Sequence, residues 1–291
     1  MPAVTQLRQP RGTAFTIRDP LPWDDVVAIA RQGERLGYEA VLLPEVGARD
    51  TLATLAGIAG ETSRLLLGTG VVPMRSRTPP LAAAAAATVQ ERSGGRHILG
   101  VGTGGSARGA LDRLGTYVRE IRGELSRSPL DLPAPVPVWI AALGPRATQL
   151  AGGIADGVIL NWCTPERVAE AREVVRAAAG EAGRDPDAVT ISVYVRAGAG
   201  DLARETLLAA ASEYGSYPSY ARQFRHMGVE PEAEAIVEAV CLPADPGAAR
   251  ERLNAYRRAG AHLPVVYPVL ASGQRAKDAI DVLASLAPEV V

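Results

Sequence analysis

The 291-residue sequence has few of the residues that mark several classes of protein. Two cysteines and three histidines provide neither a disulfide framework nor the spacing of a metal centre. Aromatic residues make up only 4% and the formal net charge is -1, which argues against a nucleic-acid-binding surface. No apolar run reaches the roughly 20 residues that span a bilayer. We therefore expect a protein that binds neither nucleic acid nor membrane.

The usual catalytic motifs are absent as well. The sequence lacks HExxH and GxSxG, and its GVGTGG run lacks the spacing of a dinucleotide fingerprint. His97 and His262 begin predicted strands, so structural roles are expected for both. His226 follows a helix and could reach the mouth, but an exposed histidine at a helix end is the favoured interpretation. Cys163 and Cys241 lie in apolar runs and are expected to be buried. Without an apolar leader in the sequence, we expect a cytoplasmic protein.

What the sequence does contain is a regular alternation of strands and helices. Each predicted helix separates two short apolar runs, the pattern of a parallel sheet covered on both faces. The alternation predicts a (β/α)8 TIM barrel that forms a single domain over 1–291, with a short insertion at 103–137 after the fourth strand. The eight predicted strands are 13–17, 40–44, 65–72, 97–102, 136–142, 157–162, 189–198 and 262–269.

Two neighbouring strands of this barrel end in glycines. They are LLLGTGVV at 65–72 and the run ILGVGTGG that begins at Ile98. One helix joins them, so both glycine ends should lie on the same rim of the barrel. A backbone without side chains can approach a flat or anionic ligand closely. The pattern predicts a floor of main chain that suits a large cofactor.

The carboxyl ends of the strands are expected to carry the site. Few acid–base groups lie there, which indicates chemistry carried by a bound organic cofactor. After the fifth strand, the amides of Leu143 and Gly144 precede a helix and can face a phosphate, with Arg146 nearby; a tight turn without ligand is the alternative. The predicted rim comprises Pro44, Glu45, Gly68, Thr69, Gly70, Val71, Gly102, Thr103, Gly104, Gly105, Ala141, Ala142, Leu143, Gly144, Asn161, Trp162, Arg196 and Tyr267.

Several of these motifs together resemble the bacterial luciferase-like monooxygenase superfamily. They are AGIAGETSRLLLGTGV, the R-x-P motif at Arg77 and Pro79, GGRHILGVGTG and PVPVWIAALGPRATQLAGGIADGVILNW. The resemblance is strong over 23–185. The last motif is more similar to members that use the deazaflavin coenzyme F-420 than to those that use FMN.

The resemblance implies a flavin or deazaflavin at the carboxyl rim, supported by a cis peptide bond between Gly70 and Val71. It also implies a phosphate loop at Ala142–Gly144 and a cofactor tail beside Thr103 and Gly104. The cofactor-binding residues expected on this basis are Pro44, Thr69, Gly70, Val71, Thr103, Gly104, Ala141, Ala142, Leu143, Gly144 and Asn161. The resemblance further implies a homodimer, formed through helices near 51–60 and 81–90.

The expected function is hydride transfer between coenzyme F-420 and a small organic substrate. Glu45 is the predicted proton donor, because it is the one carboxylate at the predicted rim beside the bulge and a half-buried carboxyl group can act as an acid; a surface charge is its alternative. Trp162, Arg196 and Tyr267 are expected on the substrate side, with Tyr194. The alternatives are an FMN-dependent monooxygenase and, since Pro44–Glu45 departs from the family's usual pair, a cofactor-less barrel that acts as a binding or dimer-forming subunit.

Overall fold

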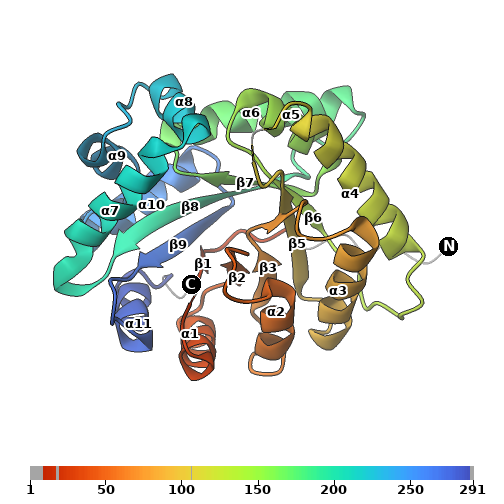
Figure 1. Cartoon of the computed structure of the whole chain (residues 1–291), viewed down its shortest axis with the longest axis horizontal. Helices are drawn as coiled ribbons and strands as arrows, with labels where there is room; N and C mark the ends of the chain where they lie inside the picture. The colour runs from red at the N-terminus through yellow and green to blue at the C-terminus, as the bar shows by residue number, and fades with distance from the viewer. Residues whose placement is uncertain (1–8, 18–19, 106, 289–291) are drawn as a thin grey trace.

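Parallel strands form a closed barrel at the centre of the molecule, and helices surround it (Figure 1). The computed structural model describes residues 9–17, 20–105 and 107–288. The strand order is β3-β2-β1-β9-β8-β7-β6-β5-β4, and an additional β3–β5 pairing closes the ring. The predicted (β/α)8 barrel is confirmed. Its strands are β1 (Ala14–Phe15), β2 (Ala40–Leu43), β3 (Leu66–Thr69), β4 (Val72–Pro73), β5 (His97–Gly102), β6 (Val138–Ala141), β7 (Gly157–Asn161), β8 (Thr190–Gly198) and β9 (Leu263–Val269).

The predicted third strand is divided into β3 and β4. Gly68 pairs with Ile98 and Val72 pairs with Val101, both in parallel register. The β3–β4 side therefore has one residue more than β5 between these pairs, which defines a bulge at the carboxyl end of the strand.

Helices cover the outside of the barrel and begin at the residues that the sequence favours. The Asp50 side chain accepts a hydrogen bond from the Ala53 amide, and Thr164 accepts one from the Arg167 amide. The barrel helices are α1 (Trp23–Arg35), α2 (Thr51–Ala59), α3 (Pro79–Arg92), α4 (Ala110–Ser126), α5 (Pro145–Ile154), α6 (Pro165–Glu181), α10 (Pro246–Arg258) and α11 (Ala276–Ser285). None of the helices in the described ranges is long and apolar enough to cross a membrane.

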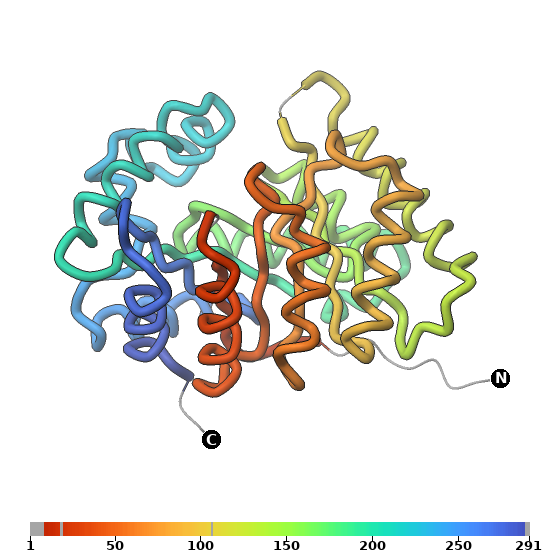
Figure 2. The backbone as a smooth tube through the Cα atoms, turned by 60° about the horizontal axis from the view of Figure 1, so that its bottom comes forward, coloured from red at the N-terminus to blue at the C-terminus, as the bar shows by residue number. Residues whose placement is uncertain are grey.

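The longest connection lies between β8 and β9. It contains η1 (Gly200–Leu202), α7 (Ala203–Ser216), α8 (Pro218–His226) and α9 (Ala233–Val240) before the barrel helix α10. The segment 103–137 contributes one helix, α4, which packs between α3 and α5; its assignment as an insertion stays a prediction. In Figure 2 the α8 region and the loop after β5 project from the same side of the molecule.

The core has three parts. One lies between the strands and the barrel helices, and a second packs around Trp162 with residues of α7, α8 and α9. The third fills the barrel itself and comprises Ala14, Ala40, Leu42, Leu66, Ile98, Trp139, Ile159, Tyr194, Leu263 and Val265. These interior residues fix which face of each strand points into the barrel.

Candidate active site at the carboxyl rim

The top layer of the barrel interior follows from the alternation of side chains along each strand. Ile159, Tyr194 and Val265 face the interior, so the residues two positions further on face the mouth of the barrel. The same alternation gives a layer of Pro44, Gly70, Gly102, Ala141, Asn161, Arg196 and Tyr267. One half of this mouth, at β3, β5 and β6, therefore carries small residues, whereas the half at β7, β8 and β9 carries large polar ones.

The bulge of the third strand lies in the small-residue half. The Gly70–Val71 peptide bond is cis, as the family resemblance implied. The Gly70 amide donates to the Leu43 carbonyl at 2.7 Å, and the Glu45 amide donates to the Val71 carbonyl at 3.3 Å. The bulge is therefore tied to the end of β2, which brings Gly70, Val71 and Glu45 together at one point of the rim.

The glycines near the bulge are required by other parts of the protein. A Cβ atom on Gly70 would lie 1.9 Å from the Tyr194 hydroxyl, and one on Gly100 would lie 2.0 Å from the Thr69 carbonyl oxygen. One on Gly102 would lie 2.9 Å from Val71 Cγ2. These contacts correct the expectation that the glycine-ended strands leave bare backbone for a ligand, since protein atoms occupy the adjacent space.

Thr69 also differs from its predicted role. Its side chain is fully buried, its hydroxyl donates to the Gly100 carbonyl at 2.7 Å, and it accepts from the Gly100 amide at 2.8 Å. The hydroxyl therefore joins β3 to β5 where the bulge interrupts their regular pairing. Thr69 supports the bulge from inside the protein and has no side-chain group left for a cofactor.

Glu45 is held in an ion-pair network at the same edge. Its Oε2 lies 2.9 Å from Arg77 Nη2, and its Oε1 accepts from the Ser76 hydroxyl at 2.9 Å. Arg77 also contacts Asp50 at 2.8 Å. Burial opposes the charge of Arg77, but the hydrogen bonds that Arg77 donates to Glu45 and Asp50 outweigh it and raise the Arg77 pKa. The surroundings of Glu45 are thus polar and cationic, not the apolar mouth expected for a proton donor.

A short loop joins β6 to α5 on the next part of the rim. Gly144 precedes α5, and a Cβ atom placed there would meet nothing within 4 Å. Arg167 lies buried behind the loop, with Nη2 donating to the Leu143 carbonyl at 3.3 Å. The start of α5 and a buried guanidinium therefore add positive potential where Leu143 and Gly144 are partly exposed.

The loop after β5 completes the small-residue half. Thr103 and Gly104 are partly exposed, and Gly104 has a φ of 66°. A Cβ atom there would lie 2.8 Å from Pro73 Cβ, so glycine is required both by backbone conformation and by packing against β4. The Arg75 side chain lies beside this loop.

Asn161, Arg196 and Tyr267 come together in the other half of the mouth, and the buried Trp162 packs behind them against Arg196; their place on the substrate side stays a prediction. Arg196 Nη1 donates to Asn161 Oδ1 at 2.8 Å, and its guanidinium carbon lies 3.7 Å from the Trp162 ring centroid. The same carbon lies 5.1 Å from the rings of both Tyr214 and Tyr267. These side chains form an aromatic cage around one buried cation.

Three residues of the long connection build this cage, and the sequence reasoning did not include them. Tyr214 of α7 packs against Trp162, the Tyr220 hydroxyl of α8 accepts from Asn161, and Gln223 donates to the Asn161 and Trp162 carbonyls. Trp162 has a φ of 51°, which is unusual for a bulky residue, and the two bonds from Gln223 hold it there. The run YGSYPSY, with tyrosines at three-residue spacing, is the one available sequence signal. Arg167 was also missed.

His97 begins β5 and His262 precedes β9, at the amino ends of the strands, whereas Cys163 follows Trp162 and Cys241 packs in the same core cluster as Trp162. Burial lowers the pKa of His97 and of His262 to about 4 and raises the thiol pKa of Cys163 to about 12 and of Cys241 to about 11. Both cysteines are buried and free, as predicted. Within the described ranges, no three His, Cys, Asp or Glu side chains are grouped to hold a metal ion.

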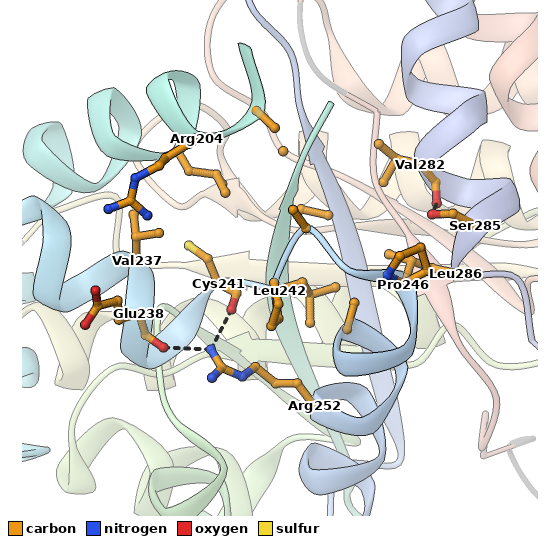
Figure 3. Close-up of a pocket in the computed structure, with 17 residues that line it drawn as sticks. Arg204, Val237, Glu238, Cys241, Leu242, Pro246, Arg252, Val282, Ser285 and Leu286 are labelled. Atoms are coloured by element: carbon orange, nitrogen blue, oxygen red, sulfur yellow. Dashed lines mark hydrogen bonds between the residues drawn. The ribbon is translucent and has the colours of Figure 1, made fainter. Parts of the chain in front are cut away.

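Among the cavities lined by described residues are three that lie beside the mouth or away from it, and none of these three is lined by Gly70, Gly102 or Arg196. One of about 440 Å³ lies outside the barrel between α7, α9, α10 and α11 (Figure 3). Arg252 closes one side of it by donating to the Glu238 and Cys241 carbonyls, both at 2.7 Å. A second, of about 460 Å³, lies between α4 and α5, and a third of about 20 Å³ adjoins Pro44. Of the mouth layer, Pro44, Gly70, Ala141, Asn161 and Tyr267 are partly exposed.

This barrel, with a bulged third strand, defines a (β/α)8 protein, a fold in which active sites lie at the carboxyl ends of the strands. The chain belongs to the luciferase-like monooxygenase family, whose sequence pattern matches residues 4–111 and 108–263.

The chain is also similar to individual curated proteins. The chain is 30% identical over 210 residues to 5,10-methylenetetrahydromethanopterin reductase of Methanolobus tindarius, and the match covers 63% of this chain and 63% of that protein. The chain therefore spans less than two thirds of the length of this curated relative.

Solved structures share the fold. Coenzyme F-420-dependent tetrahydromethanopterin reductase of Methanopyrus kandleri superposes with a TM-score of 0.75 at 18% identity, covering 94% of this chain and 97% of that one. The oxygenating constituent of 3,6-diketocamphane monooxygenase of Pseudomonas putida, solved with FMN, has a TM-score of 0.71 at 14% identity, covering 97% and 99%.

Proposed function

We propose that this protein is an oxidoreductase that transfers hydride between coenzyme F-420 and a small organic substrate. Family membership and the similarity to reductases, one of them described as F-420-dependent, support the proposal. The observation that carries it is the arrangement of one rim. The Gly70–Val71 bulge and the start of α5 lie at the same end of the barrel, and the Arg196 cage lies across the mouth from them.

The residues present fit such a cofactor at two places. The partly exposed Val71 side chain and the bulge offer an apolar support for a flat ring. The amides of Leu143 and Gly144, at the positive end of α5 and in front of Arg167, suit an anionic group. The open space beside Gly144 is a cradle that any side chain would partly fill. Thr103, Gly104, Pro44, Ala141, Ala142 and Asn161 are proposed as further contacts at the rim.

The deazaflavin supplies the carbon that carries the hydride when it is bound. The chain's own residues would position the two reactants and shape the charge around them. Glu45 and Asp50 hold Arg77 in place beside the bulge, so Glu45 acts in the proposal as a positioning residue. The Tyr220 phenol stays neutral, because burial raises its pKa to about 12.

A spectroscopic titration with each cofactor tests this proposal. Purified protein is titrated with coenzyme F-420 and, separately, with FMN, while absorbance and cofactor fluorescence are followed. Saturable binding of F-420 that is at least tenfold tighter than that of FMN is the expected result. Tight FMN binding without F-420 binding would reject the proposal.

An FMN-dependent monooxygenase is the second candidate, and the FMN-containing neighbour with a TM-score of 0.71 favours it. Reduced FMN reacts with oxygen, so oxygen consumption in the presence of reduced FMN identifies this activity. A protein that binds neither cofactor at millimolar concentration would instead be a binding or dimer-forming subunit.

We also propose that the protein acts as a homodimer in the cytoplasm. The free, buried cysteines suit a reducing compartment. Trp23 of α1 is 40% exposed and Leu81 of α3 is 54% exposed, which supports a partner surface near 51–60 and 81–90. Light scattering coupled to gel filtration tests the dimer; a mass of one chain, 30.4 kDa, would contradict it.

A further inference from the structure

Arg196 is a buried cation without a buried anion. Its side chain lies at the carboxyl end of β8, and the residue is only 4% exposed. Among the residues that the structure describes, no carboxylate oxygen lies within 4.0 Å of its guanidinium. The neighbours within reach are Asn161, Trp162, Tyr214 and Tyr267. Removing a guanidinium from water without a counter-charge is unfavourable, and stacking on aromatic rings offsets only part of that cost.

The hydrogen-bonding capacity of Arg196 is largely unused. Only Nη1 donates a side-chain hydrogen bond, to Asn161 Oδ1. Neither Nε nor Nη2 donates to any described residue, yet both keep some exposure to solvent. The Nε atoms of Arg77 and Arg167, in contrast, are fully covered. One edge of the guanidinium, with two parallel N–H directions, is therefore available to an incoming group.

This edge belongs to the mouth of the barrel. Arg196 occupies the layer directly above Tyr194 and is paired in register with Tyr267. The opposite part of the layer carries Gly70, Gly102 and Ala141, where the proposed cofactor ring would lie. A substrate between the two would meet the ring on one side and the free guanidinium edge on the other.

The cage holds Arg196 in one orientation before any ligand arrives. The guanidinium is stacked 3.7 Å from the Trp162 ring centroid, and Gln223 fixes the Trp162 backbone through two carbonyl oxygens. Tyr220 and Arg196 together hold both ends of the Asn161 amide. Such preorganisation favours a planar, bidentate partner, and a carboxylate has that geometry.

We propose that the substrate carries a carboxylate and that Arg196 binds it through Nε and Nη2. This inference rests on the proposed function, because it places the substrate against a cofactor on the other half of the mouth. The substrate class is then a small organic acid in which the carbon that exchanges hydride lies near the carboxylate.

The test uses tryptophan fluorescence of the apo protein, because Trp162 stacks directly on Arg196. Acetate and benzoate are titrated as carboxylate probes, and acetamide and benzamide serve as neutral isosteres. Saturable fluorescence changes with the acids but not with the amides are expected. Equal responses to acids and amides would overturn the proposal.

Three variants locate the effect. Arg196→Gln should weaken benzoate binding at least tenfold, Arg196→Lys should weaken it by a smaller factor, and the exposed Arg222→Gln should leave it unchanged. Near-ultraviolet circular dichroism checks the fold of each. If Arg196→Gln fails to fold, the benzoate affinity of Arg196→Lys tests the proposal, because lysine keeps the positive charge but cannot donate the two parallel hydrogen bonds. Wild-type benzoate affinity in a folded Arg196 variant would contradict the proposal.

A last arm separates this inference from the proposed function. Benzoate is titrated again with saturating coenzyme F-420. Simultaneous binding supports a substrate carboxylate site, whereas mutual exclusion would assign Arg196 to the cofactor and overturn the inference. Benzoate binding without any F-420 binding would leave the carboxylate site standing and refute the proposed cofactor.

Discussion

The hydroxyl of Tyr194 lies directly beneath Gly70. It is 3.2 Å from the Gly70 carbonyl oxygen and 3.0 Å from that of Leu42, and a Cβ atom on Gly70 would approach it to 1.9 Å. Burial raises the pKa of Tyr194 far above its ordinary value, so the phenol is a neutral donor. A tyrosine in the barrel core thus fixes the height of the bulge at the mouth.

This contact predicts that Gly70 and Tyr194 are energetically coupled. Gly70→Ala should lower the free energy of unfolding by about 1–3 kcal/mol through overpacking, and Tyr194→Phe should lower it by about 1 kcal/mol through loss of a hydrogen bond. The double variant should lose less than the sum, because the hydroxyl that clashes is gone. Denaturant unfolding of the four proteins measures the coupling; strict additivity would refute the contact.

Gly144→Asp is predicted to weaken cofactor binding without loss of the fold. The new carboxylate enters open space and would repel an anion at the start of α5. We expect the affinity to fall more than tenfold, over about 1.4 kcal/mol.

Gly153→Asp is the matched control for this prediction, since Gly153 lies in the same helix and also has open space at its Cβ. It should keep the wild-type affinity. Equal effects of both substitutions would move the anion-binding site away from Gly144.

Glu45→Gln distinguishes a positioning role from proton donation. Both carboxylate oxygens of Glu45 are engaged, by Ser76 and by Arg77. We therefore expect the variant to raise KM or lower kcat by about tenfold at most, with an unchanged pH profile of kcat. Asp50→Asn, which removes the second carboxylate at Arg77, should act similarly. Loss of one limb of the pH profile in Glu45→Gln alone would restore Glu45 as the proton donor.

The buried His97 predicts a loss of stability in mild acid. Its Nδ1 donates to the Leu67 carbonyl at 2.7 Å, and burial lowers its pKa from 6.5 to about 4. His97 therefore binds a proton more tightly in the unfolded chain than in the folded protein. The free energy of unfolding should be unaffected by His97 above pH 6.5 and should fall as the pH drops from 6.5 toward 4. The pKa difference of His97 between the unfolded and folded states corresponds to a loss of about 3 kcal/mol in the free energy of unfolding once the pH is below both values.

Urea unfolding at several pH values between 4 and 7.5 measures this dependence. His97→Gln should reduce the slope of the free energy of unfolding against pH. His262, whose pKa is also about 4, should account for part of the slope that remains. A His97→Gln curve as steep as that of the wild type would contradict the assignment.

Much of the fold could be predicted because local signals were strong. The predicted strand at 97–102 is β5 (His97–Gly102), and the side chains of Asp50 and Thr164, residue types that favour helix starts, cap α2 and α6. The division of the third strand into β3 and β4 could not be predicted, because the apolar run at 65–72 has the pattern of one continuous strand. The cis bond at its bulge followed from the family resemblance, not from the residues themselves.

The candidate site could be predicted only in outline. Strand ends identified Asn161, Arg196 and Tyr267, because alternation along parallel strands fixes which residues share a rim. Contacts between residues that are distant in the sequence could not be predicted. Arg77 binds Glu45, which is 32 residues away, and Asn161 donates to Tyr220, which is 59 residues away. A glycine also does not reveal whether a ligand or another part of the protein fills the space beside it, as Gly100 shows.

The central claim is that the cofactor binds across the carboxyl rim. Amide hydrogen exchange, measured with and without saturating coenzyme F-420, tests it most directly. Slower exchange at 70–72, 103–105 and 143–147 is the predicted result. Protection confined to the residues that line the cavity between α7, α9 and α10, with no change at the rim, would contradict the account.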